Sequence, residues 1–194
     1  MNVPKPVATL SLDLDNKWSY LKTNGQRRWE LFPSFLDVVV PRVLSFFKER
    51  GLTVTIFIVG QDAALDKNHD VLKSLAVAGH EIGNHSFHHK QWLHLYSEWQ
   101  VEEELAQAEQ YIERATGQRP IGFRGPGFSI SPTTLKVLAR RGYLYDASTL
   151  PTYVGPLMKA YSFGRGSLSS DDKHLRQALF GTFWEGLRPL KPYR

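Results

Sequence analysis

The sequence contains no cysteine, and this absence narrows the chemistry open to the protein. Disulfide bonds, thiolate nucleophiles and cysteine-type zinc sites are excluded together, so histidine and carboxylate side chains remain as the candidate metal ligands. Long apolar runs are also absent, because no stretch approaches the roughly 20 residues that a membrane-spanning helix needs. The first ten residues hold one lysine and two prolines in place of the apolar region of a secretory signal. We therefore expect a cytoplasmic protein without a membrane span.

Charge of one sign is not concentrated anywhere in the chain. Lys and Arg outnumber Asp and Glu by 24 to 19, which predicts a mildly positive surface. No block of basic residues is long enough to indicate a nucleic-acid partner. A length of 194 residues with 42% hydrophobic residues is sufficient for one well-buried domain, and we expect a single domain over residues 1–194.

Short apolar runs typical of strands alternate with amphipathic segments typical of helices. The clearest helix spans residues 97–115, because Ser97 and Gln100 form a capping-box pattern at its start. Strands that alternate with helices predict a parallel sheet or barrel. The predicted strands are 7–14, 52–59, 80–84, 120–123 and 143–146, and the predicted helices are 34–50, 62–78, 97–115 and a segment that begins at Ser131.

Polar residues follow the predicted strands at the points where the strands end. In parallel βα architectures, functional side chains gather at the carboxyl ends of the strands. Chance would scatter some of these residues onto helix faces, so their shared placement indicates one functional rim. The candidates on this rim are Asp13, Asp15, His85, His89, Arg124 and Asp146.

The residue types on this rim suit metal-assisted hydrolysis. His85 and His89 are four residues apart, so a helix or tight turn would point both imidazoles the same way. A carboxylate from another strand end would complete three ligands and leave a fourth position open for water. An Asp pair at a strand end is also a common turn former or helix N-cap, and that alternative stays open from the pair alone.

The motifs resemble those of the polysaccharide deacetylases that share the NodB-homology domain. Residues 85–89 (HSFHH) are similar to the family's H-[ST]-x-x-H motif, residues 124–126 (RGP) to its R-x-P motif, and residues 145–148 (YDAS) to its fourth motif. The first motif of the family usually reads T-F-D-D-G, whereas residues 13–15 (DLD) resemble a D-x-D branch. The resemblance extends from about Leu10 to Pro151.

The resemblance implies a fold and a set of roles. The fold is an α/β, parallel (β/α) barrel-like fold of the polysaccharide deacetylase type, with the last barrel units missing at the C-terminal end. A divalent metal ion is implied, with zinc favoured by ligand type and nickel or cobalt able to replace it. The metal ligands would be Asp15, His85 and His89, the general base Asp13, the residue that orients it Arg124, and the substrate-binding residues Gly125, Pro126 and Asp146.

The family's usual proton donor, a late histidine, has no clear counterpart here. After Ser148 the sequence contains only His174, within a polar segment at 169–179 that reads as a helix face, and we assign it no catalytic role. A second polar segment, the acidic run at 102–104, predicts a solvated helix face.

The sequence therefore predicts a metal-dependent hydrolase of a carbon–nitrogen amide bond. The expected substrate is an N-acetylated amino sugar in a polysaccharide or its precursor. Two alternatives are a hydrolase of a small cyclic amide or ureide, and a catalytically silent sugar-binding domain that retains the metal. Aromatic residues near the motifs favour a carbohydrate, because their faces suit stacking on sugar rings: Trp18, Tyr20, Trp29 and Trp92.

Overall fold

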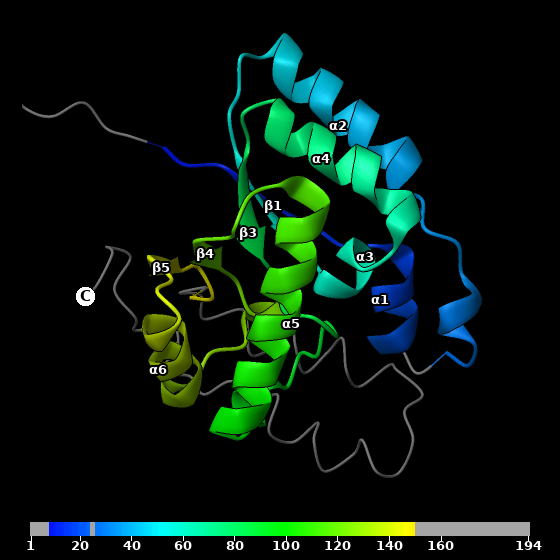
Figure 1. The fold of residues 1–194 in the computed structure, drawn as a ribbon. Coiled ribbons are helices and arrows are strands. Elements are labelled where there is room, and N and C mark those ends of the chain that lie inside the picture. Colours follow the sequence, from blue (N-terminus) through cyan, green and yellow to red (C-terminus); the bar gives the residue numbers. More distant parts are fainter. Residues whose placement is uncertain (1–7, 24–25, 150–194) are drawn as a thin grey trace, which may run out of the picture.

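In the part of the chain that the structure describes, five parallel strands form one sheet, and their order in space, β1-β2-β3-β4-β5, is their order in the sequence. Figure 1 labels β1, β3, β4 and β5 of this sheet. The computed structural model describes residues 8–23 and 26–149. The predicted segment at 169–179 with His174, and the predicted extension of one domain to residue 194, lie outside the described residues. The strands are β1 (Ser11–Leu14), β2 (Thr55–Ile58), β3 (Glu81–Asn84), β4 (Gly122–Phe123) and β5 (Tyr145–Asp146).

The helices follow the strands in the same succession. Helix α2 packs on α4, α4 on α5 and α5 on α6, as expected when consecutive parallel strands are joined by right-handed crossovers. This arrangement confirms the predicted parallel α/β fold. None of the described helices is both long and apolar enough to cross a bilayer. The α-helices are α1 (Lys17–Thr23), α2 (Leu36–Glu49), α3 (Gly60–Ala63), α4 (His69–Val77), α5 (Glu98–Thr116) and α6 (Pro132–Arg140), and the 3-10 turns are η1 (Trp29–Leu31), η2 (Asp66–Asn68), η3 (Leu93–Leu95) and η4 (Pro126–Phe128).

The single helix predicted at 62–78 is wrong, because the chain breaks it into α3, η2 and α4. A continuous helix would bond the carbonyls of residues 62 and 63 to the N–H groups four residues later. The side chain of Asn68 instead donates to the Asp62 carbonyl at 2.8 Å. The His69 ring donates from Nε2 to the Ala63 carbonyl at 3.0 Å. These two side chains satisfy the end of α3 and let α4 begin in a new direction.

The two faces of the sheet carry different side chains. Asp13, Phe57 and Gly83 align in register across β1, β2 and β3. Their neighbours along the strands point to the opposite face, because side chains alternate along a strand. That opposite face joins α2, α4 and α5 in the main hydrophobic core through Leu14, Ile56, Ile58 and Ile82. Since Asp15 is two residues beyond Asp13, both carboxylates lie on the face away from these helices.

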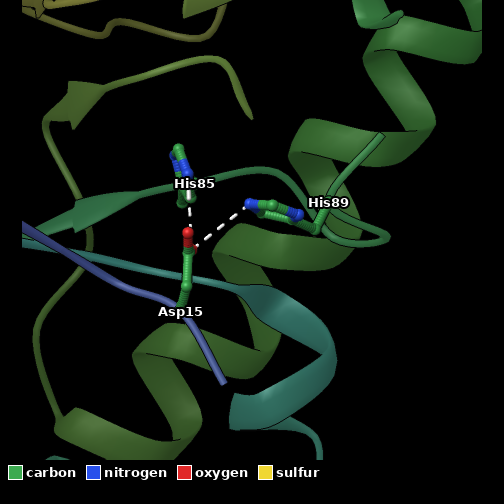
Figure 2. A group of neighbouring side chains, drawn as sticks. All are labelled: Asp15, His85 and His89. Atoms are coloured by element: carbon green, nitrogen blue, oxygen red, sulfur yellow. Dashed lines mark ion pairs between the residues drawn. The ribbon is translucent and has the colours of Figure 1, made fainter. Parts of the chain in front are cut away.

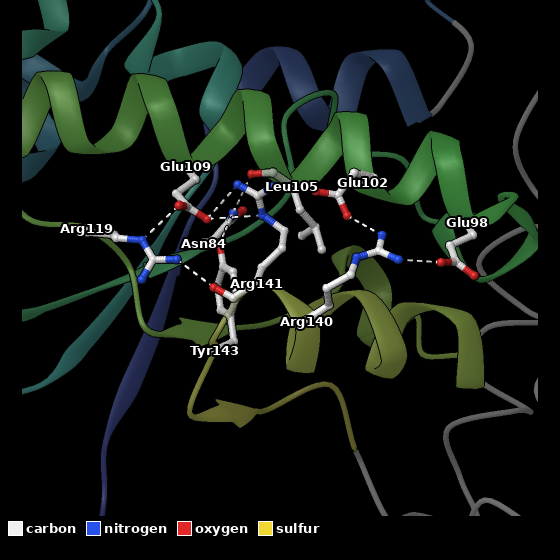
Figure 3. A network of polar contacts seen from close by, with 9 residues as sticks. All are labelled: Asn84, Glu98, Glu102, Leu105, Glu109, Arg119, Arg140, Arg141 and Tyr143. Carbon is white, nitrogen blue, oxygen red and sulfur yellow. Dashed lines mark hydrogen bonds and ion pairs between the residues drawn. The ribbon is translucent and has the colours of Figure 1, made fainter.

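Helix α5 connects the main core to a second, smaller one. Its predicted capping box is present, with Ser97 accepting from the Gln100 N–H and Gln100 accepting from the Ser97 N–H. Arg140 at the end of α6 and Arg141 directly after it form ion pairs with glutamates of α5, namely Glu98, Glu102 and Glu109 (Figure 3). The second core is formed by Leu93, Val101, Leu105, Phe123, Val137 and Leu138.

Candidate metal centre

Three side chains from two strand ends converge at the carboxyl edge of the sheet (Figure 2). Asp15 Oδ1 lies 3.2 Å from His89 Nε2 and 3.7 Å from His85 Nε2. One ligand atom from each of the three residues lies within 4.8 Å of the others. The structure thus brings together the three residues that the sequence predicts as metal ligands.

The turn after β3 sets the direction of the two imidazoles. It is a tight turn rather than a helix, since Ser86 and His89 adopt left-handed backbone angles with φ of 61° and 52°. Asn84 Oδ1 accepts from the Ser86 N–H at 2.8 Å, and Ser86 Oγ accepts from the His89 N–H at 3.2 Å. The His85 N–H continues the sheet by donating to the Ile58 carbonyl at 2.9 Å.

Glu104 of α5 holds the same turn through hydrogen bonds. Its Oε2 accepts from the N–H groups of Phe87 and His88 at 2.9 and 3.0 Å, and its Oε1 accepts from His88 Nδ1 at 2.7 Å. With 5% of its surface exposed, Glu104 is not on a solvated helix face, so that prediction for the run at 102–104 is wrong for this residue. The sequence held a sign of this burial, because Glu104 lies on the same helix face as the apolar residues Val101 and Ala108, which are also buried.

His85 is fixed in the tautomer that suits a metal ligand. Its Nδ1 is 2.6 Å from the Arg124 carbonyl oxygen, which accepts and cannot donate, so Nδ1 carries the proton and Nε2 the lone pair. Burial, reinforced by the neighbouring His89, lowers the pKa of His85 to about 4, against the opposing effect of the two carboxylates. The ring is therefore neutral near pH 7, with its lone pair towards Asp15.

The residues present fit a divalent metal. Two imidazoles and one carboxylate, with positions left for water, are the ligand types of catalytic zinc sites. Ligands about 2.0 to 2.1 Å from a tetrahedral zinc lie roughly 3.3 Å apart. The distance from Asp15 Oδ1 to His89 Nε2, 3.2 Å, is close to this value, and the 3.7 Å to His85 Nε2 is longer. Asp15 Oδ1 is buried and receives no hydrogen bond from the described residues, as expected of an atom reserved for a cation. Burial acts to raise the pKa of Asp15, yet the imidazoles of His89 and His85 hold it below its usual value.

A second carboxylate, Asp13, lies beside this cluster and is held by Arg124. The guanidinium donates from Nη1 to Asp13 Oδ1 at 2.7 Å, from Nη2 to Ser11 Oγ at 2.7 Å and from Nε to the Ala147 carbonyl at 3.2 Å. It also lies over the Phe57 ring, 4.3 Å from the centroid. The Phe128 ring lies on it as well, with its centroid 5.7 Å away. Three hydrogen bonds and two ring contacts fix the guanidinium, so the orientation of Asp13 is fixed with it.

The three predicted substrate-binding residues are connected to one another. The Gly125 N–H donates to Ser148 Oγ at 2.8 Å, and Ser148 Oγ donates to Asp146 Oδ1 at 2.5 Å. Pro126, which follows Gly125 in the chain, is buried. Gly125 has no room for a side chain, since an added Cβ would lie 2.0 Å from the Ser129 carbonyl oxygen. Asp146 Oδ2 accepts from the Ser148 N–H at 3.2 Å, so the Gly125 N–H and both Asp146 oxygens are used inside the protein.

The aromatic residues near the site differ in accessibility. Trp18 is buried, so it is not available to stack on a sugar, and this part of the sequence interpretation is wrong. Trp29 packs against it with ring centroids 5.4 Å apart, and Lys22 lies over both rings. Tyr20 is exposed on α1. Of this group, Tyr20 and the half-buried Trp29 and Trp92 retain surface that a ligand can reach.

Comparison with known proteins identifies relatives of this chain. The sequence profile of the family described as Polysaccharide deacetylase matches residues 28–145, a range that includes His85, His89 and Arg124 but begins after Asp13 and Asp15. A peptidoglycan deacetylase of Helicobacter pylori is 30% identical over 114 residues, which cover 59% of this chain and 38% of that protein.

Two solved structures resemble the described fold. A family 4 carbohydrate esterase from Streptomyces lividans, in complex with acetate, has a TM-score of 0.52 and 28% identity, covering 59% of this chain and 56% of its own. A family 4 acetyl xylan esterase from Clostridium thermocellum, in complex with a cobalt ion, has a TM-score of 0.52 and 26% identity, covering 66% and 53%. The chain spans about half or less of the length of these relatives.

Proposed function

Because this chain belongs to the polysaccharide deacetylase family, we propose that it is a metal-dependent hydrolase that removes the acetyl group from an N-acetylated amino sugar. The substrate would be a polysaccharide or its precursor. The observation that carries the proposal is the convergence of Asp15, His85 and His89 beside a second, separately held carboxylate, Asp13.

Asp15, His85 and His89 would hold the metal, with zinc the best match to two imidazoles and one carboxylate. A bound divalent metal would supply a Lewis acid for the amide carbonyl and lower the pKa of a water at the open position. The surrounding protein would keep the ligands in the charge state and orientation that a metal ion requires. Burial keeps His85 neutral, and Glu104 holds the turn that carries His89.

Asp13 would act as the general base that takes a proton from the attacking water. Arg124 occupies its Oδ1, which leaves Oδ2 as the oxygen that accepts the proton. The two carboxylates of the D-x-D motif would therefore have different roles, Asp15 as a metal ligand and Asp13 as the base, although both lie on the same face of the sheet. Gly125, Pro126 and Asp146 would shape the wall next to the base, since Asp146 supports Gly125 through Ser148.

The first test is the metal content of the purified chain, followed on the same sample by acetate release from N-acetylglucosamine oligomers with and without added zinc. We expect one zinc per chain and acetate release that depends on it. Zinc without acetate release would reject the deacetylase proposal and favour a small cyclic amide substrate or a silent sugar-binding domain. Absence of zinc would reject the metal centre.

The second test separates the roles of the carboxylates. Asp15→Ala and His89→Ala should lose zinc, because each removes one of three ligands. Asp13→Asn should keep zinc and lose turnover, because the amide cannot accept the proton. Asp70→Ala, at an exposed position on α4, is the matched control and should change neither property. Equal loss of zinc in the three site variants would contradict the assignment of the base.

A further inference from the structure

A buried carboxylate at the start of α3 has no part in the roles assigned above. Asp62 is 0% exposed. Its Oδ1 accepts from Trp18 Nε1 at 2.8 Å and from Asn16 Nδ2 at 3.0 Å. Its Oδ2 is also buried, yet no described residue donates to it. Burying a polar oxygen without a partner is costly, so this atom calls for a donor.

His89 carries a buried atom of the opposite kind. Its Nε2 faces Asp15, so a role as metal ligand places the lone pair on Nε2 and the proton on Nδ1. This Nδ1 is buried and lacks a hydrogen-bond partner within the described part of the chain. Among the described residues, the Nδ1–H of His89 is therefore a buried donor without a partner, and Asp62 Oδ2 is a buried acceptor without one. The other two buried side-chain oxygens without a partner in this part of the chain are Asp15 Oδ1, which faces His89 Nε2, and the amide oxygen of Gln61.

The start of α3 and the histidine turn are directly connected. The Gly60 N–H donates to the Ser86 carbonyl at 2.9 Å, and the Gln61 N–H donates to the Phe87 carbonyl at 3.1 Å. An added Cβ on Gly60 would lie 2.7 Å from the Phe87 ring, so only glycine permits this approach.

Trp18 contacts both Asp62 and His89. Its Nε1 donates to Asp62, and its ring meets the His89 ring edge to face, with centroids 6.4 Å apart. Burial raises the pKa of Asp62, the nearby Asp15 adds to this effect, and His89 acts in the opposite direction. Asp62 and His89 thus lie close enough to interact electrostatically, although no direct bond joins them.

We propose that Asp62 is a positioning residue for the metal centre: a single bridging water accepts from the His89 Nδ1–H and donates to Asp62 Oδ2. The inference rests on the metal centre proposed above. The arrangement would fix the His89 ring in the tautomer that presents Nε2 to the metal, as the Arg124 carbonyl does for His85. A buried water fits where polar groups of both kinds face one another. Partners of this type contribute about 10- to 100-fold to metal affinity.

The test compares zinc affinity, by chelator competition, in the full chain and in Asp62→Asn. The asparagine keeps the volume of the side chain and the acceptor for Trp18 and Asn16, but replaces Oδ2 by an N–H donor, so the bridging water can no longer donate to residue 62. We expect zinc binding to weaken about 10- to 100-fold. Glu109→Gln is the matched control, because it also neutralises a buried carboxylate but lies on α5 among arginines. Its zinc affinity should stay within about twofold of the unmodified chain.

The outcomes separate this inference from the proposed function. If the unmodified chain binds zinc and Asp62→Asn binds it equally well, the role of Asp62 is overturned and the metal centre stands. If the unmodified chain binds no zinc, the metal centre is overturned, and the role of Asp62 with it.

A second measurement needs no altered Asp62 and so does not depend on the folding of that variant. Imidazole nitrogen NMR of the zinc-loaded chain reports the tautomer of each histidine, and His89→Gln identifies the His89 signals by their loss. We expect a proton on His89 Nδ1 that exchanges slowly with solvent, and zinc on Nε2. A proton on Nε2, or zinc bound through Nδ1, would overturn the proposal.

Discussion

Removing the Glu104 carboxylate should release the turn that carries His85 and His89. In Glu104→Ala, the N–H groups of Phe87 and His88 lose the acceptor that lies 2.9 and 3.0 Å away. A buried donor left without a partner costs about 1 to 3 kcal/mol, so two such donors predict a loss of about 4 kcal/mol in the free energy of unfolding. The bond from His88 Nδ1 adds little, because that side chain is 47% exposed.

Glu104→Gln should lose less, about 1 to 2 kcal/mol, because the amide oxygen still accepts from both N–H groups but without the charge. Urea denaturation of the metal-free chain measures both values, and zinc affinity measured on the same variants reports the order of the turn. Glu103→Gln is the control, since Glu103 is the exposed neighbour on the same helix and should change stability by less than about 0.5 kcal/mol. If Glu104→Ala unfolds within 1 kcal/mol of the unmodified chain, the turn does not depend on these bonds.

Three further predictions concern the residues around the metal centre. Arg124→Lys should slow acetate release about tenfold or more at unchanged zinc content, because a lysine ammonium cannot reproduce the planar group that bonds Asp13, Ser11 and the Ala147 carbonyl together; an unchanged rate would contradict the orienting role. In Gly83→Ala the new Cβ would lie 2.4 Å from the Phe57 ring. Crowding of this kind costs about 1 to 3 kcal/mol in urea denaturation, and adding Phe57→Leu should restore part of the loss. In the metal-free folded chain, burial lowers the pKa of His85 from 6.5, its value in an unfolded chain, to about 4. Between these two pH values the unfolded chain therefore binds one more proton than the folded chain. The free energy of unfolding should therefore fall as the pH drops through that window, by at most about 3 kcal/mol, and His85→Asn should show a shallower dependence.

The sequence predicted the fold well where local patterns decide the structure. All five strands lie within the predicted segments, because β-branched runs that end at Gly or Asp are strong local signals. Helix α5 begins where its capping box predicts. The break between α3 and α4 was missed, because it depends on the side chains of Asn68 and His69 reaching back to carbonyls, and apolar periodicity does not report such bonds.

The sequence predicted which three residues converge at the candidate site, but not the residues that support them. His85 and His89 share one short motif, and the rule that strand ends meet at one edge was enough to bring Asp15 to them. Glu104 bonds the histidine turn at Phe87, 17 residues away along the chain, and Asp62 bonds Trp18, 44 residues away, which packs on His89. Each is an acidic residue inside a buried segment, and burial depends on tertiary packing that one sequence does not reveal.

Arg124 is synthesised after β1, β2 and β3, so the interactions that it makes at this edge of the sheet form late. A chain made from its N-terminus presents β1, β2 and β3 first, and their sheet order allows each strand to dock on the previous one as it emerges. Asp15 and His89 can meet at that stage. His85 still lacks the carbonyl that orients its ring, and Asp13 still lacks its guanidinium, until β4 adds Arg124, which supplies both. One residue therefore orients both His85 and Asp13 in a single late step. Under the roles proposed above, a nascent chain that ends before residue 124 would hold a cation weakly and have no aligned base beside it.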